Sequence, residues 1–173
     1  MSAPSFEELL SSARHSAVHL EMRDGYMAEP ALDAWKAGSR ADHLAEDEDF
    51  QQWLGWVRDA TERGVRVRRA RVFSTPESDY IRWEYFISDA NAAAGEEIRW
   101  LPRRQATDIA FPGNDFWVFD SRTVVVLHFT GDGEAAGEGW MELNADPHVL
   151  QLCTAAFEAV WERAIPHAEY RPG

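Results

Sequence analysis

The segment from Asn114 to Phe129, NDFWVFDSRTVVVLHF, constrains the fold more than any other part of the chain. It predicts two adjoining strands, DFWVFD and TVVVLHF, joined by a tight link at Ser121 and Arg122. The second strand is apolar at nearly every position, which is typical of a strand that is covered on both faces of its sheet. We therefore expect the rest of the chain to cover this pair.

The first part of the chain, residues 1–64, is expected to be helical. The first helix is expected to begin at a capping box, Ser5-Phe6-Glu7-Glu8, and a second helix is expected over residues 30–37. The acidic segment 42–49 is expected to lie at the start of a third helix. Residues 18–22 either continue the first helix or form a short extended segment.

The second part, residues 65–164, is expected to combine sheet and helix, followed by an irregular tail over 165–173. Strands are predicted beside the central pair, over residues 65–73, 98–101 and 140–143, and helices over 77–94 and 147–164. This order predicts one α/β or α+β domain, 1–173, with a mixed central sheet of about five strands flanked by helices.

Composition narrows the class of protein. The 173 residues include eight Trp, nine Phe and four Tyr, enough apolar surface for a real core. The formal net charge of -13 argues against direct binding to nucleic acid or to an anionic membrane. The single cysteine, Cys153, excludes an internal disulfide. With no leader and no apolar run of the roughly 20 residues that span a bilayer, we expect a soluble cytoplasmic protein.

The segment Asp79 to Glu84 mixes charge with aromatic surface more densely than a plain core helix requires. Tyr, Trp and Arg concentrate binding energy at interfaces and pocket walls. The predicted site for a ligand or a protein partner consists of Arg68, Tyr80, Arg82, Trp83, Glu84, Arg99, Trp100, Asp115 and Trp117. The alternative interpretation is an aromatic core with paired surface charges.

Arginines crowd the strand that runs from residue 65 to 73. On an extended strand Arg66 and Arg68 point one way, and Arg69 and Arg71 point the other way. One hypothesis pairs them with the acidic segments 42–49 and 77–79. The other hypotheses are an anion or partner site and, third, direct DNA binding.

No metal or cofactor is predicted. His15 and His19 would share a face of a continuous helix near Glu21, but we expect them to be polar residues of a helix surface rather than metal ligands. His128, inside the apolar strand, is expected to be a hydrogen-bonded core histidine.

Five segments in collinear order resemble the actinobacterial family DUF6879. They are HLEMRDGY (19–26), VRRARVFSTPESDYIRWEY (67–85), AGEEIRWLPRR (94–104), NDFWVFD (114–120) and AFEAVWERAIPHAEY (156–170). The resemblance implies a protein encoded beside helix-turn-helix regulators, and it carries over no catalytic residue.

The order of elements also resembles one half of a phospholipase D-like domain, whose signature is His-x-Lys-x4-Asp with the histidine as nucleophile. If Asp120 occupies the aspartate position, the histidine position falls on Gly113 and the lysine position falls on Asp115. Glycine offers no nucleophile, and a carboxylate repels phosphate. The resemblance therefore implies a catalytically inactive half domain.

These observations favour a non-enzymatic accessory or regulatory protein that binds a small ligand or a protein partner, such as a helix-turn-helix regulator. The alternative is an enzyme that acts on a phosphorylated or carboxylated substrate. Its anion clamp would be Arg68, Arg82 or Arg99, and its proton-transfer group would be Glu84, Asp115 or His128.

Overall fold

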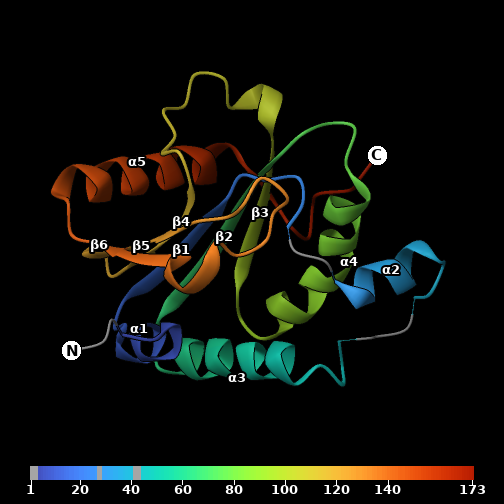
Figure 1. The fold of residues 1–173 in the computed structure, drawn as a ribbon, viewed down its shortest axis with the longest axis horizontal. Coiled ribbons are helices and arrows are strands. Elements are labelled where there is room, and N and C mark those ends of the chain that lie inside the picture. Colours follow the sequence, from blue (N-terminus) through green and yellow to red (C-terminus); the bar gives the residue numbers. More distant parts are fainter. Residues whose placement is uncertain (1–3, 27–28, 41–43) are drawn as a thin grey trace.

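A mixed sheet of seven strands runs through the middle of the molecule (Figure 1). The computed structural model describes residues 4–26, 29–40 and 44–173. The strands are β1 (Ser16–Glu21), β2 (Arg66–Phe73), β3 (Glu97–Pro102), β4 (Asp115–Phe119), β5 (Thr123–Leu127), β6 (Met141–Asn144) and β7 (Ile165–Pro166). Their order is β6-β5-β4-β1-β2-β3-β7. β1, β2 and β3 are parallel, and every other neighbouring pair is antiparallel.

Helices cover both faces of this sheet (Figure 1). The α-helices are α1 (Phe6–Ser12), α2 (Pro30–Lys36), α3 (Glu48–Glu62), α4 (Asp79–Ala93) and α5 (Pro147–Arg163), with short 3-10 helices at Arg103–Gln105 and Gly137–Gly139. α5 packs on one face, whereas α1, α3 and α4 pack on the other face. None of the helices within the described residues is long and apolar enough to cross a membrane.

The mixed α/β class is confirmed, but the sheet has seven strands rather than about five. The additional strands are β1, in the part expected to be helical, and β7, in the tail expected to be irregular. The first helix stops at Ser12 because the Asp120 carboxylate binds the next backbone N–H groups, at distances of 2.7 to 3.2 Å from the nitrogens of Arg14, His15 and Ser16. These bonds turn the chain out of α1 and into β1.

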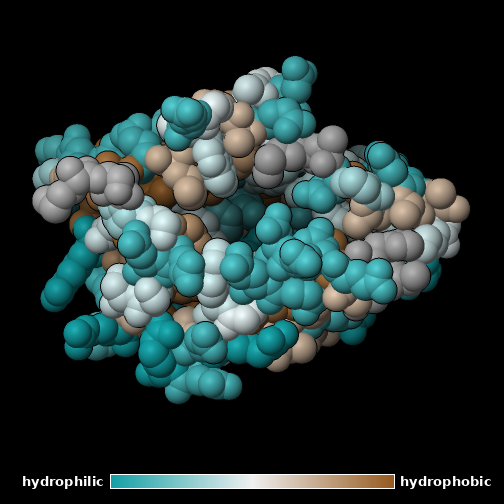
Figure 2. Space-filling view, turned by 60° about the horizontal axis from the view of Figure 1, so that its bottom comes forward, coloured by the Kyte–Doolittle hydropathy of each residue, from teal (hydrophilic) through white to brown (hydrophobic). Residues whose placement is uncertain are grey.

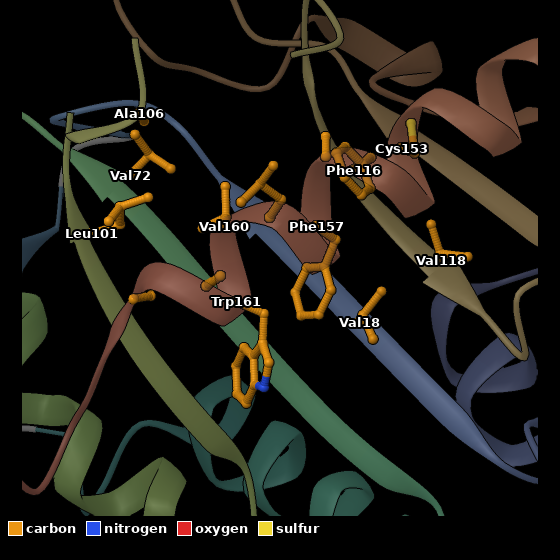
Figure 3. Packing of buried hydrophobic residues seen from close by; sticks show 14 of the residues in the cluster. Val18, Val72, Leu101, Ala106, Phe116, Val118, Cys153, Phe157, Val160 and Trp161 are labelled. Atoms are coloured by element: carbon orange, nitrogen blue, oxygen red, sulfur yellow. The ribbon is translucent and has the colours of Figure 1, made fainter. Parts of the chain in front are cut away.

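The larger hydrophobic core lies between the sheet and α5 (Figure 3). Phe157, Val160 and Trp161 of α5 point toward apolar side chains such as Val18 and Val118. The most deeply covered strand is β4, in which all five residues are buried. In β5 both Thr123 and Val126 are only partly buried, so the expectation of a strand covered on both faces fits β4 better.

The opposite face of the sheet is much more polar at its centre. Alternation along the strands directs one set of side chains toward α3 and α4: His19 and Glu21 of β1, Arg69 and Arg71 of β2, and Asp115 and Trp117 of β4. Because β2, β1 and β4 are adjacent, these side chains meet in one place. That place is the floor of the pocket described next.

Candidate functional site: an aromatic and acidic pocket

A pocket of about 630 Å³ opens above this polar part of the sheet. Its floor includes His19, Glu21, Arg69, Asp115 and Trp117. Its walls include Phe50, Trp53 and Trp56 of α3, and Tyr80, Trp83, Glu84, Ile87 and Asn91 of α4. Segments outside these helices add Tyr26, Glu29, Phe129 and Trp140. The space-filling view from the side of α3 shows a hollow with hydrophilic surface at its bottom (Figure 2).

Aromatic rings form a large part of the pocket wall. The lining includes ten Phe, Tyr and Trp residues, among them five of the eight tryptophans of the chain. Neighbouring rings brace one another: the centroids of Trp53 and Trp117 lie 5.7 Å apart, and those of Tyr80 and Trp83 lie 5.6 Å apart. The indole N–H of Trp53 donates to Asn91 at 2.8 Å, which ties α3 to α4. The walls are therefore fixed by contacts that need no ligand.

A network of buried ion pairs crosses the pocket floor. Arg69 lies between Glu21 (3.2 Å) and Glu96 (2.7 Å), and Arg71 lies between Glu21 (2.6 Å) and Glu84 (2.5 Å). Burial on its own would raise the pKa of Glu21, but Arg71 and Arg69 lower that pKa far below its ordinary value. Both arginines are thus ion-paired with carboxylates of the protein itself.

His19 extends this network toward β4. Its Nδ1 lies 2.8 Å from the carbonyl oxygen of Phe116, and its Nε2 lies 3.0 Å from Glu21 Oε1. Both ring nitrogens thus lie within hydrogen-bonding distance of an oxygen acceptor. The ring also stacks on Trp117, with centroids 4.3 Å apart and planes 4° from parallel.

Among the residues that the structure describes, Asp115 is the buried carboxylate that makes no ion pair with an arginine. It is 3% exposed, and it accepts hydrogen bonds from the Tyr26 hydroxyl and from the backbone N–H of Met22 at 2.9 Å. Burial, opposed by the Tyr26 hydrogen bond and reinforced by Glu21, raises the pKa of Asp115. Burial and the charges of Glu21 and Asp115 also raise the pKa of Tyr26. The Tyr26 phenol therefore stays protonated, and it donates to an Asp115 carboxylate that is poorly hydrated.

The turn between β5 and β6 holds Tyr26 in position. Gly133 has φ +87°, and a Cβ atom there would lie 3.1 Å from Tyr26 Cα. The Tyr26 ring packs edge-on against Phe129, with centroids 5.1 Å apart. Glycine is therefore needed both for the backbone conformation and for the close approach.

Five of the nine residues predicted from the sequence lie together in this pocket: Tyr80, Trp83, Glu84, Asp115 and Trp117. The other four lie outside its lining. Arg68 and Arg99 belong to the opposite face, where each stacks on Trp161 at 5.2 and 4.4 Å from the ring centroid. Trp100 is buried against Phe73 and Tyr170, and Arg82 is a partly buried residue of α4.

Sequence reasoning did not select Glu21, Tyr26, Arg69 or the tryptophans of α3 for the site. A signal was present, because charged side chains recur at alternate positions in His19-Leu20-Glu21 and Arg69-Ala70-Arg71. Using it required recognition that residues 16–21 form a strand beside β2.

The arginine stripe is paired, though with other partners than segments 42–49 and 77–79. In the described part of the chain Arg66 pairs with Glu97 (2.6 Å) and Arg68 pairs with Glu158 (2.7 Å), while Arg69 and Arg71 enter the pocket network. Positions 42 and 43 of the acidic segment 42–49 lie outside the described residues. The two sides predicted for the stripe are the two faces of the sheet.

Two histidine expectations need correction. His15 and His19 do not share a helix face, because His19 lies in β1, and no group of three His, Cys, Asp or Glu side chains within residues 4–26, 29–40 and 44–173 is arranged to hold a metal ion. His128 is not a core residue: its side chain is 35% exposed and pairs with Glu142 of β6 at 2.8 Å.

Comparison with known proteins gives a family and a fold. The profile of the family described as a domain of unknown function, DUF6879, matches residues 4–172. No curated protein sequence matches the chain.

Among solved structures, the phospholipase D family member Nuc from Salmonella typhimurium is similar, with a TM-score of 0.50, 16% identity, and coverage of 95% of this chain and 88% of that chain. The archaeal chromatin protein TrmBL2 has a TM-score of 0.44 and 17% identity over 92% of this chain, which spans 48% of that protein. The likeness to Nuc confirms the phospholipase D-like fold that the order of elements implied.

Proposed function

The chain belongs to the DUF6879 family, and from its pocket we propose that it is a non-enzymatic accessory or regulatory protein that binds a small ligand. The observation that carries this proposal is a pocket of about 630 Å³ walled by aromatic rings and floored by fixed polar groups. Small-molecule sites have volumes of about 300–1,000 Å³ and combine apolar walls with a few oriented polar groups.

The residues at the phospholipase D-like motif positions support binding rather than catalysis. If Asp120 occupies the aspartate position of the motif, Gly113 stands where the motif has its nucleophilic histidine, and Asp115 stands where it has its lysine. Only Asp120 matches the motif, and its carboxylate caps the backbone N–H groups that precede β1. With a carboxylate in place of a cation, the pocket repels the phosphate of a phospholipase-type substrate.

The alternative, an enzyme with an arginine anion clamp, has less support. Arg68, Arg82 and Arg99 do not line the pocket, and Arg69, which does, is held between Glu21 and Glu96. A substrate anion would have to displace one of these carboxylates. The partner suggested by the family resemblance, a helix-turn-helix regulator, fits the proposal as the protein that receives the binding signal.

A thermal-shift panel of cellular metabolites, run beside a phosphodiesterase assay with bis(p-nitrophenyl) phosphate, tests the proposal. A ligand at about 100 times its Kd stabilises the folded state by about 2.7 kcal/mol. For a chain of this size, each kcal/mol raises Tm by about 2–4 °C. We expect at least one stabilising ligand and no hydrolysis. Hydrolysis that disappears in Asp115→Asn, without any stabilising metabolite, would favour the enzyme.

A further inference from the structure

The chemistry of the pocket lining restricts the ligands that it can hold. The faces of aromatic rings carry partial negative charge, and Trp binds cations through its ring better than Tyr or Phe does. Five tryptophans line this pocket together with three phenylalanines and two tyrosines. The protein's own Arg69 already uses one of them, since its guanidinium lies 5.6 Å from the Trp53 centroid.

Carboxylates exceed cationic groups around the same space. Among the described residues, six acidic side chains line the pocket (Glu21, Glu29, Asp47, Asp49, Glu84 and Asp115), and Arg69 is the one arginine of that lining. Within the described residues Asp115, Asp49 and Glu29 have no ion-pair partner, whereas Glu21 and Glu84 have theirs. Arg69 and Arg71 are already shared among three carboxylates.

This negative potential also acts on the groups at the pocket mouth. Burial raises the pKa of Glu29, and the charges of Glu84 and Asp47 raise it further. Three carboxylates from different elements, α3, α4 and the start of α2, thus face the same space. A positively charged occupant would relieve this repulsion.

Resting on the proposed function, we infer that the ligand is a small organic cation whose charged nitrogen is held by the tryptophan faces and neutralised by Asp115 and the acidic rim. A rigid aromatic wall favours a bulky, weakly hydrated cation, such as a quaternary or heavily substituted ammonium, over a bare metal ion. The inference also accounts for Asp115, a buried carboxylate that makes no ion pair with an arginine of the protein within the described residues.

Three matched probes test this inference by isothermal titration calorimetry on the full chain. 3-Hydroxyphenyltrimethylammonium is the cation, 3-tert-butylphenol is its neutral counterpart of the same shape, and phenyl phosphate is an anion of similar size. We expect the cation to bind about 30-fold more tightly than the phenol, equivalent to about 2 kcal/mol at 1.4 kcal/mol per tenfold change. Phenyl phosphate should show no binding, and added salt should weaken the binding of the cation.

A pair of variants in the first turn of α3 locates the effect. Asp49→Asn and Glu48→Gln each remove one exposed negative charge, but only Asp49 lines the pocket. Asp49→Asn should raise the Kd of the cation by about two- to fivefold, because exposed charge pairs contribute up to about 1 kcal/mol. Glu48→Gln should change the Kd of the cation by less than about twofold.

The possible outcomes separate the two claims. If 3-tert-butylphenol or phenyl phosphate binds as tightly as the cation or more tightly, the inference of an organic cation is overturned. The proposal that the pocket binds a ligand then still stands. Equal loss of affinity in both α3 variants also overturns the inference of an organic cation, because the attraction would then be a general charge effect. If none of the three probes binds at 10 mM, the cation inference fails, while the metabolite panel still decides the proposed function.

Discussion

The hydroxyl of Tyr26 donates a hydrogen bond to the buried carboxylate of Asp115. These residues lie 89 positions apart, one following β1 and the other opening β4. Their bond fixes the carboxylate at the pocket floor. A buried carboxylate that makes no ion pair is costly to keep in a folded protein, which is a reason to connect it with ligand binding.

Neutralisation of Asp115 should therefore not destabilise the protein at neutral pH. Burial, together with Glu21, raises the pKa of Asp115 above 3.8, so the charged form is disfavoured in the folded state relative to the unfolded chain. This cost is present at pH 7 and vanishes as the pH falls below 3.8, where both states are protonated. Asp115→Asn should be at least as stable as the natural chain at pH 7 by urea denaturation, with a difference that shrinks toward pH 4. A clear loss of stability at pH 7 would contradict this account.

Loss of an arginine from the buried ion-pair network beside the pocket should have a large effect on stability. Arg71 has a side chain 3% exposed between Glu21 and Glu84, so Arg71→Ala leaves two buried carboxylates without it and should cost about 3–5 kcal/mol. The matched control on the same strand is Arg66→Ala, because the Arg66–Glu97 pair is about half exposed on both sides. Its cost should be below about 1 kcal/mol. Similar urea midpoints for the two variants would show that the network does not support the fold.

The core between the sheet and α5 should behave as a packed interior. Phe157 is fully buried, so Phe157→Ala should cost about 3–5 kcal/mol. Leu152 of the same helix is 36% exposed, and Leu152→Ala should cost less than about 1 kcal/mol. Guanidinium denaturation of the two variants measures both values. The prediction fails if the exposed position proves the more costly.

Asp120 should matter for folding and not for binding. Its carboxylate accepts the backbone N–H groups of Arg14, His15 and Ser16, and its φ is 49°, a region that Asn and Asp tolerate better than most residues. Asp120→Ala should cost about 1–2 kcal/mol, whereas Asp120→Asn should retain part of the cap. Ligand affinity, measured by calorimetry, should be unchanged in Asp120→Asn. A loss of ligand affinity without a loss of stability would show instead that Asp120 takes part in binding.

Sequence patterns captured the elements with strong local signals. The capping box at Ser5 and Glu8, the Asp146 N-cap with Pro147, and the apolar run of β4 and β5 all specify structure through neighbouring residues. β1 was ambiguous, because SAVHLE is short and its position in the sheet depends on long-range pairing with β2 and β4. β7 has only two residues, and pairing with β3 alone defines it.

The candidate site was predictable only in part, for the same reason. Tyr80, Trp83 and Glu84 lie close in sequence on α4 and could be grouped by helical spacing. Arg68 and Arg99 were grouped with them by residue type, but strand alternation directs both to the α5 face. The place of Tyr26 in the site depends on the packing of its loop against Gly133. Because these residues are far apart in the sequence, no local pattern predicts this contact.

The central claim, that this pocket binds a ligand, is tested most directly by filling it. Ile87 and Phe86 are neighbours on α4, but only Ile87 lines the pocket, while Phe86 is 37% exposed. The measurement is the thermal shift that a stabilising metabolite or 3-hydroxyphenyltrimethylammonium produces in Ile87→Trp and in Phe86→Trp. We predict a shift in Phe86→Trp equal to that of the natural chain and little or none in Ile87→Trp. An undiminished shift in Ile87→Trp would contradict the account.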